Sequence, residues 1–419
     1  METTSLLEKG PSRAFFIFRY TFLDMKGTLS CEACGAVPAP HLPLRITTTV
    51  DTLMLSIPVH QWRVYRLLTK IGDTVLTVLG RIAFSACRML GIIKLTDDAE
   101  TAVSDRSRLL WLEAKKRAIP MEQLLFFGKP SDTFRVVTNG KEHFFKSLPF
   151  PSVDVDVLRM DDKVWFKRAM EKAGLPVPKS FGVSDMKGAR KALKEVGVAC
   201  VKPRTGSNGR HTYTYVKTEK DLQEALKSVK EICAFASVEE QLEGNLCRAT
   251  CVGGSMIGFL ESQYPTVVGD GASTIAELIE KTNAAKPDGV GDIVMNSSYA
   301  GQLKRRGQNL DSVLPEGTRF PISYRAGSAI GGSNREHGRN VHPSFIPIIE
   351  AAAKLTGLSI VGFDIIIPDP LKPESEQRWG FIEANSLPWI DLHASPFYGE
   401  PKDLSAAVWD QWASASLMR

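Results

Sequence analysis

The sequence predicts an α/β protein whose helices and strands are packed as α+β lobes. Three observations predict this class. Between residues 161 and 385, segments with helix-capping signals alternate with short apolar strands. The connections between these segments are mostly short, and no internal repeat is present. Hydrophobic residues make up 43% of the 419 residues and charged residues 24%, so the chain can bury a sizeable core, and disordered or low-complexity classes are excluded.

Charge, cysteine content and hydropathy limit the compartment and the partners. The formal net charge of +5 is too small a bias to predict a nucleic-acid partner, but it is compatible with a site for polyanionic phosphates. Seven scattered cysteines favour a reduced, cytoplasmic location. No run approaches the roughly 20 apolar residues of a membrane span, and the N-terminus does not have the pattern of a secretory signal. We therefore expect no membrane span.

Residues 1–103 are predicted as an unassigned, partly helical extension. Residues 36–44 contain three prolines and predict irregular chain, residues 53–95 predict helices, and residues 95–105 predict an acidic, turn-like linker. A docking arm, a dimerisation element in a homo-oligomer and a lid are alternative roles for this extension.

The only close cysteine pair, Cys31 and Cys34, lies in this extension. A single CxxC pair without a second one is open to two interpretations. It is either an incidental pair in an arm or part of a zinc or redox site, and the incidental pair is the favoured interpretation.

Residues 109–146 predict a helix and a hairpin. The helix over residues 109–120 ends at Pro120. Strands over residues 134–137 and 143–146 flank Asn139 and Gly140, which supply the positive φ angles of a type I′ turn.

Residues 161–385 predict alternating helices and strands. Thr218 with Asp221, and Thr274 with Glu277, have the spacing of a capping box or close to it, which predicts a helix start at each threonine. Helices are predicted over residues 161–173, 184–196, 218–232, 275–284 and 343–355, and strands over residues 199–203, 212–216, 236–242, 247–252, 257–263, 359–367 and 379–385.

Two lysines are candidate phosphate ligands. Lys202 lies at the end of the predicted strand 199–203 and precedes a loop with two glycines, whose backbone N–H groups are free to meet a polyphosphate. The loop is not a Walker A motif, because no Gly-Lys-Ser/Thr follows, and a loop that only turns the chain is an equally good interpretation. Lys163 lies at a predicted helix start, where most lysines are solvated.

Three residues on two strands are candidate metal ligands. Asp364 lies inside a continuous apolar strand, where a carboxylate is costly to bury without a cationic partner. Glu383 and Asn385 are two residues apart on the next strand and therefore share a face. If the two strands pair antiparallel, these oxygens converge and suit Mg²⁺. A salt bridge to an arginine is the alternative for either carboxylate alone.

In this order and at this spacing, these features resemble the ATP-grasp superfamily, and within it the ATP-grasp domain of cyanophycin synthetase and glutathione synthetase-like amino-acid ligases. The resemblance covers about residues 160–396 and includes the motifs VKPRTGSNGR, LSIVGFDIIIPD and FIEANSLPWIDLHASP. It implies two lobes that clamp ATP. It also implies a small α/β domain over residues 104–160 and an ATP-grasp domain over residues 161–419, with its lid lobe at about 182–245.

The resemblance implies a role for each of several residues. Lys163 and Lys202 would contact the nucleotide phosphates, and Glu239 would accept a hydrogen bond from the adenine amino group. The other implied nucleotide-binding residues are Gly206, Ser207, Asn208, Gly209 and Arg210 in a flexible loop, with Gln241 and Leu242 beside Glu239. Asp364, Glu383 and Asn385 would hold one or two Mg²⁺ ions, with Mn²⁺ as an alternative, and Arg248, Arg325 and His393 would lie on the catalytic side.

The implied activity is ATP-dependent ligation of a carboxylate to an amine through an acyl phosphate, with an amino acid or short peptide as substrate. Two alternatives stay open. One is an ATP-grasp enzyme of another outcome, such as a carboxylate–thiol ligase or a kinase, and the other is a non-catalytic nucleotide-binding scaffold.

The chain departs from the family pattern at several positions. Leu246 stands where a carboxylate usually binds the ribose, with Glu243 as a candidate substitute, and His211 stands where a glycine commonly follows the loop arginine. Residues 329–332 differ from the Ser-Thr-Gly-Gly of cyanophycin-type ligases. The sequence ends about 25 residues after the last match, without a Mur-ligase-like half, so synthesis of cyanophycin itself is not expected.

Overall fold

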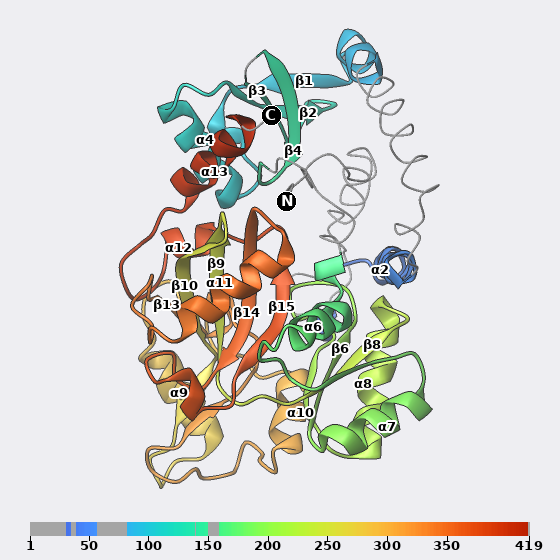
Figure 1. Cartoon of the computed structure of the whole chain (residues 1–419). Helices are drawn as coiled ribbons and strands as arrows, with labels where there is room; N and C mark the ends of the chain where they lie inside the picture. The colour runs from blue at the N-terminus through green and yellow to red at the C-terminus, as the bar shows by residue number, and fades with distance from the viewer. Residues whose placement is uncertain (1–30, 35–38, 57–81, 139, 150–158, 418–419) are drawn as a thin grey trace.

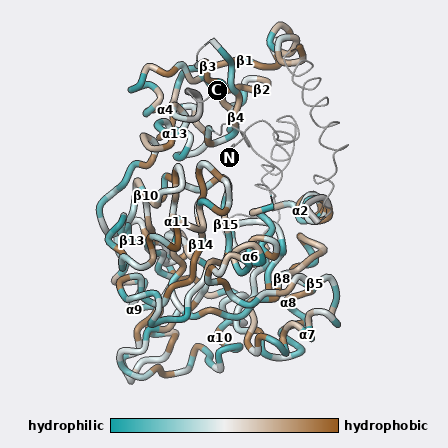
Figure 2. Tube along the Cα trace, in the orientation of Figure 1, coloured by the Kyte–Doolittle hydropathy of each residue, from teal (hydrophilic) through white to brown (hydrophobic). Residues whose placement is uncertain are grey.

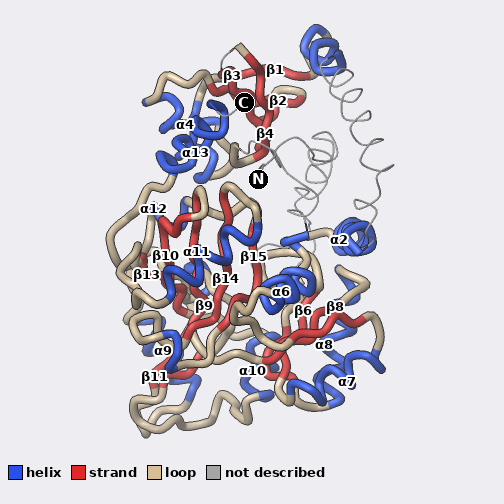
Figure 3. The backbone as a smooth tube through the Cα atoms, viewed as in Figure 1, coloured by secondary structure: helices blue, strands red, loops and turns tan. Residues whose placement is uncertain are grey.

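The computed structural model describes residues 31–34, 39–56, 82–138, 140–149 and 159–417 (Figure 1). The strands of these residues form four sheets, and every strand pair within the sheets is antiparallel (Figure 3). None of the helices described combines the length and the apolar character needed to cross a bilayer.

The largest sheet has five strands in the order β13-β10-β9-β14-β15. Its strands are β9 (Asn245–Val252), β10 (Ser255–Gln263), β13 (Ser333–Glu336), β14 (Ile360–Ile367) and β15 (Gly380–Asn385). Helices α6 (Lys163–Lys172) and α11 (Phe345–Thr356) share one buried core with β9, β10, β14 and β15, in which Phe166 stacks on Phe363. The continuous apolar sequence of β14 is visible in Figure 2, and it reflects burial between neighbouring strands and helices.

A four-stranded sheet in the order β5-β8-β6-β7 forms a separate lobe beside α6. It contains β5 (Ser180–Val183), β6 (Ala199–Pro203), β7 (Tyr213–Val216) and β8 (Ala236–Glu240), covered by α7 (Met186–Val196) and α8 (Glu219–Ile232). Helix α2 (His41–Ser56) lies against α8, where Leu44 packs on Ile232 and Thr48 donates to the Ile232 carbonyl at 2.6 Å. Helix α2 of the N-terminal extension is therefore attached to this lobe.

A third sheet in the order β1-β2-β3-β4 lies at the other end of the molecule (Figure 1). It contains β1 (Ile93–Thr96), β2 (Met121–Phe126), β3 (Lys129–Thr138) and β4 (Lys141–Lys146), and it packs with α4 (Asp105–Lys116) and α13 (Ser405–Leu417). Trp409 of α13 is fully buried there and donates its indole N–H to the Leu110 carbonyl at 2.9 Å. The helix nearest the C-terminus thus completes the core of a sheet formed early in the sequence.

The remaining elements connect these units. Strands β11 (Thr266–Val268) and β12 (Arg319–Pro321) pair, and the helices α9 (Ile275–Ala284), α10 (Ser297–Arg305) and α12 (Asp391–Ala394) lie along the loops around the central sheet. Short 3₁₀ turns lie at Glu32–Cys34, Ala99–Thr101, Arg159–Asp161, Ser328–Ile330 and Glu374–Glu376.

Most predicted elements between residues 161 and 385 are confirmed. Both capping boxes are present. The hydroxyls of Thr218 and Thr274 accept from the backbone N–H of Asp221 and Glu277, and the backbone N–H of each threonine donates to the carboxylate of that partner. The hairpin of β3 and β4 is confirmed, although Asn139 lies outside the described residues. Strands β2, β5, β11, β12 and β13 and helices α10, α12 and α13 were not predicted.

Three predictions in the N-terminal extension are only partly correct where the structure describes it. Residues 36–44 are not all irregular, because α2 begins at His41 and includes Pro43 in its first turn, where the missing N–H has no intrahelical partner to lose. Residues 53–56 and 82–89 are helical as predicted, but residues 93–95 belong to β1, which pairs with β2. Residues 95–105 contain a turn as predicted, at Ala99–Thr101, but they also finish β1 and begin α4. Residues 57–81 of the predicted helices lie outside the described residues.

Candidate functional site

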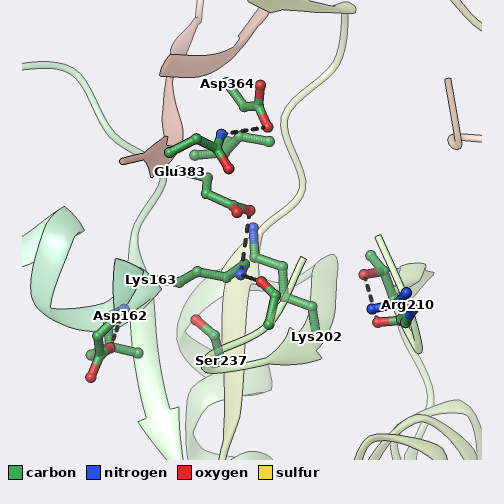
Figure 4. A network of polar contacts seen from close by, with 12 residues as sticks. Asp162, Lys163, Lys202, Arg210, Ser237, Asp364 and Glu383 are labelled. Carbon is green, nitrogen blue, oxygen red and sulfur yellow. Dashed lines mark hydrogen bonds and ion pairs between the residues drawn. The ribbon is translucent and has the colours of Figure 1, made fainter. Parts of the chain in front are cut away.

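Three lysines and two glutamates meet where the lobe adjoins the central sheet. We call them the lysine–carboxylate cluster: Lys163, Lys167, Lys202, Glu239 and Glu383. Figure 4 shows Lys163, Lys202 and Glu383 directed toward one another. The two sheets and α6 each contribute to the cluster, because Lys202 and Glu239 lie on β6 and β8, Glu383 lies on β15, and the other lysines lie on α6. The group therefore forms only when the two sheets come together.

Glu239 is the buried centre of this cluster, with 1% of its surface exposed. Lys167 Nζ lies 2.9 Å from Glu239 Oε1, and Lys202 Nζ lies 3.0 Å from Oε2. Ser237, two residues earlier on β8, donates to Oε1 at 2.7 Å. The register of the sheet explains this contact set, because Lys202 is paired with Ser237 across β6 and β8.

One carboxylate cannot balance two buried ammonium groups, and the pKa values reflect this. Burial alone would raise the pKa of Glu239, but the two lysines lower it to about 2. Burial lowers the pKa of Lys167 to about 8 despite the contact with Glu239. Burial acts in the same direction on Lys202, but there the Glu239 charge prevails and raises the pKa. With three lysines and only two glutamates, the cluster has one positive charge in excess and is suited to bind a further anion.

Lys163 connects the cluster to the glycine-containing loop 206–210. Its Nζ donates to the Gly206 carbonyl at 2.6 Å and lies 3.3 Å from Glu383 Oε2. The helix start is fixed by Asp162, whose Oδ1 caps α6 and whose carboxylate also receives Arg204 Nη2 at 2.7 Å. In the loop, Gly206, Asn208 and Gly209 have φ angles of +120°, +64° and +59°, so the chain turns sharply after Lys202.

Asp364, Glu383 and Asn385 converge as the sequence predicted. Strands β14 and β15 pair antiparallel, with Asp364 directly opposite Glu383. Asn385 Nδ2 donates to Asp364 Oδ2 at 3.3 Å. The alternative interaction, a salt bridge from a carboxylate to an arginine, is present as well, because Arg248 Nη2 lies 2.6 Å from Asp364 Oδ1 and 2.9 Å from Oδ2. The acidic pair is therefore flanked by Arg248 on one side and Lys163 on the other.

The residues that follow Glu239 are held by their own neighbours. Gln241 Oε1 accepts from the Tyr215 backbone N–H at 3.3 Å, and Gln241 Nε2 donates to the Leu242 carbonyl at 2.9 Å. Glu243, the candidate substitute for the carboxylate missing at Leu246, accepts from the Tyr215 hydroxyl at 2.6 Å. This segment connects β8 to β9 and is therefore next to the cluster in the chain.

Two of the predicted catalytic residues have their contacts elsewhere. His393 is fully buried, with Nδ1 2.6 Å from Glu336 Oε2 and Nε2 2.7 Å from Thr250 Oγ1. Arg325 donates to the carbonyls of Glu32 and Ala33, at 3.3 and 2.5 Å. Within the described residues, the contacts of His393 and Arg325 named above do not include the lysine–carboxylate cluster, whereas Arg248 reaches its edge through Asp364.

Lys167 was missed by sequence reasoning, although a signal was present. It lies four residues after Lys163 on the same helix, so the two side chains share one face. That face also carries Met170, which is buried, so a lysine there needs a buried partner. A partner on a strand about 70 residues away is not readable from the helix pattern.

Comparison with known proteins gives related sequences of ligases. Cyanophycin synthetase from Synechocystis sp. is 32% identical over 259 residues, which cover 59% of this chain and 30% of that protein. The glutathione biosynthesis bifunctional protein GshAB from Mannheimia succiniciproducens is 27% identical over 325 residues, which cover 72% of this chain and 42% of that protein. The chain thus spans about a third of the length of the cyanophycin synthetases it matches. No protein-family profile matches the chain.

Among solved structures, a bifunctional glutathione synthetase from Pasteurella multocida aligns with a TM-score of 0.48 and 22% sequence identity, covering 74% of this chain and 44% of that chain.

Proposed function

Since the chain is related to the ATP-grasp superfamily, we propose that it is an ATP-dependent ligase that joins the carboxylate of an amino acid or short peptide to an amine. In the proposed reaction, a carboxylate oxygen attacks the γ-phosphorus of ATP, the bond to ADP breaks, and an acyl phosphate forms. The amine then attacks the acyl carbon, phosphate leaves, and the amine nitrogen loses a proton. The products are an amide, ADP and phosphate.

The lysine–carboxylate cluster is the observation that carries this proposal. Phosphoryl transfer needs preorganised positive charge and alignment more than it needs a nucleophilic side chain. Lys163 and Lys202 are buried and held in place by Glu383 and Glu239. We assign them to the phosphates of ATP, next to the loop 206–210, in which residues 206–209 are exposed and whose backbone N–H groups would supply further donors.

The acidic residues beside the lysines fit a divalent cation. Asp364, Glu383 and Asn385 supply hard oxygen donors at adjacent positions of one strand pair, as Mg²⁺ prefers, with Mn²⁺ as the alternative. Bound there, the ion would neutralise charge on the phosphates. Arg248 and Lys163 orient the two carboxylates through ion pairs. Because Arg248 pairs with Asp364, we also assign it to stabilise the charge on the phosphoryl group as it is transferred.

The other predicted site residues enter the proposal with narrower roles. The carboxylate of Glu239 already accepts three hydrogen bonds, from Lys167, Lys202 and Ser237, and its oxygens have capacity for one more, so a contact with the adenine amino group is compatible with its contacts. Gln241 and Leu242 would border the nucleobase. His393 and Arg325 would act as positioning residues, through Thr250 and Glu336 and through the turn Glu32–Cys34 respectively.

The test is ADP release from the purified full chain with Mg²⁺ and ATP across a panel of amino acids and dipeptides, with and without hydroxylamine. Hydroxylamine converts an acyl phosphate into a stable hydroxamate. We expect substrate-dependent ADP release with hydroxamate in the wild type. Glu383→Gln should abolish both signals, whereas Glu374→Gln, an acidic residue of the 3₁₀ turn Glu374–Glu376, should retain them.

Each other outcome contradicts the proposal in a defined way. ADP release without hydroxamate would indicate a kinase or a different acceptor. ATP binding in a direct titration, with no ADP release for any substrate and no difference between the wild type and Glu383→Gln, would indicate a nucleotide-binding scaffold.

A further inference from the structure

A second group of chemically reactive side chains lies outside the lysine–carboxylate cluster. We call it the Cys2His2 cluster: Cys31, Cys34, His41 and His211. Their ligand atoms all lie within 4.8 Å of one another. Cys34 Sγ lies 3.4 Å from His41 Nε2 and 3.5 Å from His211 Nε2, and Cys31 Sγ lies 3.9 Å from His211 Nε2. Two ligands come from the turn Glu32–Cys34 or the residue before it, one from the start of α2, and one from the end of the loop that follows β6.

The distances fit a tetrahedral metal better than a set of thiol–imidazole hydrogen bonds. Zn²⁺ binds cysteine sulfur at about 2.3 Å and histidine nitrogen at about 2.0–2.1 Å, so a sulfur and a nitrogen on neighbouring corners of the tetrahedron are about 3.6 Å apart. The three sulfur–nitrogen distances lie on either side of that value. A hydrogen bond accounts for one thiol and one ring nitrogen, but it does not require four ligands to face one point.

Both histidines are held by residues that leave Nε2 directed at the sulfurs. His41 Nδ1 lies 3.2 Å from Glu231 Oε2, and His211 Nδ1 lies 2.8 Å from Ser228 Oγ. Glu231 and Ser228 lie three residues apart on α8, so one helix face orients both rings. A carboxylate or hydroxyl on the far nitrogen is the usual arrangement for a metal-binding histidine, because it fixes the tautomer and the ring plane.

The backbone conformation of His211 also supports a metal site. His211 has a φ angle of +51°, in the left-handed region that glycine adopts without a steric penalty. A histidine is sterically disfavoured in this region, so other contacts must hold the imidazole in place. The side chain is fully buried and the backbone N–H donates to the Ala33 carbonyl at 2.8 Å. The loop therefore brings this histidine to the cysteine turn by both its main chain and its side chain.

The cysteine turn is fixed by further contacts with the rest of the protein. Arg325 donates to the carbonyls of Glu32 and Ala33, and Ser297 of α10 donates to the Glu32 carboxylate. Cys34 itself is only 2% exposed. The turn next to the two thiols is thus held by three separate segments, which contain Ser297, Arg325 and His211.

We propose that Cys31, Cys34, His41 and His211 bind one Zn²⁺ ion as a structural site. Two thiolates and two imidazoles form a closed set of four ligands that zinc prefers, and such a set leaves no position for a substrate. Binding converts the two thiols to thiolates and releases their protons, and no oxidant or reductant is consumed. The ion fastens the N-terminal arm to the loop that follows β6 and to α8, which goes beyond the proposed ligase activity.

The site restrains the loop 206–210 from its far end. Lys163 bonds to Gly206 at the beginning of the loop, and His211 directly follows its last residue. Thr205, just before the loop, donates to the Thr48 carbonyl of α2 at 3.1 Å. The zinc ion would therefore set the position of a loop whose other end is set by the lysine–carboxylate cluster.

The test is the metal content of the full chain, purified with reducing agent, incubated with Zn²⁺ and freed of excess metal by gel filtration. Elemental analysis should give one zinc per chain in the wild type. Cys34→Ser and His211→Gly should lose it, and His211→Gly suits the left-handed backbone at this position. Matched controls are Cys87→Ser and His342→Gln, a cysteine and a histidine outside the cluster, which should each keep one zinc.

A spectroscopic readout on the wild type makes the result independent of any variant that fails to fold. Co²⁺ in place of Zn²⁺ should give the strong visible bands of a tetrahedral ion and the near-ultraviolet charge-transfer band of thiolate ligation. Zinc content near zero in the reconstituted wild type would overturn the proposal. So would equal zinc in the wild type and both ligand variants, a weak octahedral Co²⁺ spectrum, or a Cys31–Cys34 disulfide without metal under reducing conditions. None of these readouts depends on ligase activity.

Discussion

The lysine–carboxylate cluster and the Cys2His2 cluster lie at opposite ends of the loop 206–210, and they are stabilised in different ways. In the first, ammonium groups and carboxylates are direct partners, so most of the buried charge is compensated within the protein. In the second, all four groups are donors of the kind that a cation binds, and none of them carries a countercharge for the others. The comparison indicates that the first cluster is preorganised before its ligand binds, whereas the second is complete only with its ion.

The largest expected effect is the loss of the carboxylate at the centre of the first cluster. Glu239→Gln should lower the free energy of unfolding by about 3–5 kcal/mol, because it leaves two buried lysines without a countercharge. Urea denaturation of both proteins measures this difference.

Glu240→Gln is the matched control, since the adjacent glutamate pairs with Arg378 on a partly exposed surface. It should change the free energy of unfolding by less than about 1 kcal/mol. Equal losses for the two variants would contradict internal charge compensation at Glu239.

The second cluster should instead stabilise the protein only when metal is present. With free Zn²⁺ at a hundred times its dissociation constant, the free energy of unfolding should rise by about 2.7 kcal/mol relative to the chelated protein. The same comparison with His211→Gly should give no difference, and Mg²⁺ in place of Zn²⁺ should give none in the wild type. A zinc effect that persists in the variant would place the ion elsewhere.

The orientation of the histidines should contribute a smaller effect. Glu231→Gln removes the charged partner of His41 Nδ1 and should weaken zinc binding about tenfold. Competition with a chelating indicator measures the dissociation constant. Glu224→Gln, an exposed change on the same helix, is expected to leave it unaltered, and an equal loss in both variants would count against the role given to Glu231.

The smallest expected effect is the loss of the stability contribution of Glu239 at low pH. The Glu239 pKa is lowered from 4.5 to about 2 in the folded protein, so its contribution to stability is present above pH 4.5 and is lost as the pH falls toward 2. Between pH 5.5 and 3.5, the stability difference between the wild type and Glu239→Gln should narrow by about 1.3 kcal/mol. Denaturation at the two pH values checks this, and a constant difference would show that the lysines do not lower this pKa.

Much of the fold could be predicted from the sequence because the residues that specify each helix or strand are close together in the chain. The capping residues Thr218 and Thr274, and the apolar strand around Asp364, each specify a structure within a few residues. The pairing of Asp364 with Glu383 followed from two neighbouring strands, so the acidic half of the candidate site was predictable. The ATP-grasp relationship predicted from the motifs is confirmed by the related sequences.

The remainder depended on contacts between distant segments. The His211 and Cys34 ligand atoms meet although 177 positions separate them, so the CxxC pair alone gave no reason to prefer zinc. Lys167 and Glu239 are 72 positions apart, which hid the centre of the lysine–carboxylate cluster. Strand β1 was hidden because its four residues gain stability only by pairing with β2.

The attachment of α13 to the first sheet has a consequence for how the chain folds as it is made. Trp409 bonds to Leu110 across 299 positions and fills the same core as Trp111 and Phe134. At a ribosomal rate of about 5–20 residues per second, that core waits roughly 15–60 s after Leu110 is added before its last helix exists. Until then β1 to β4 expose the surface that α13 will cover. A nascent chain of this protein therefore exposes apolar surface on its first sheet until α13 has been made, and chaperone protection there would be needed for that interval.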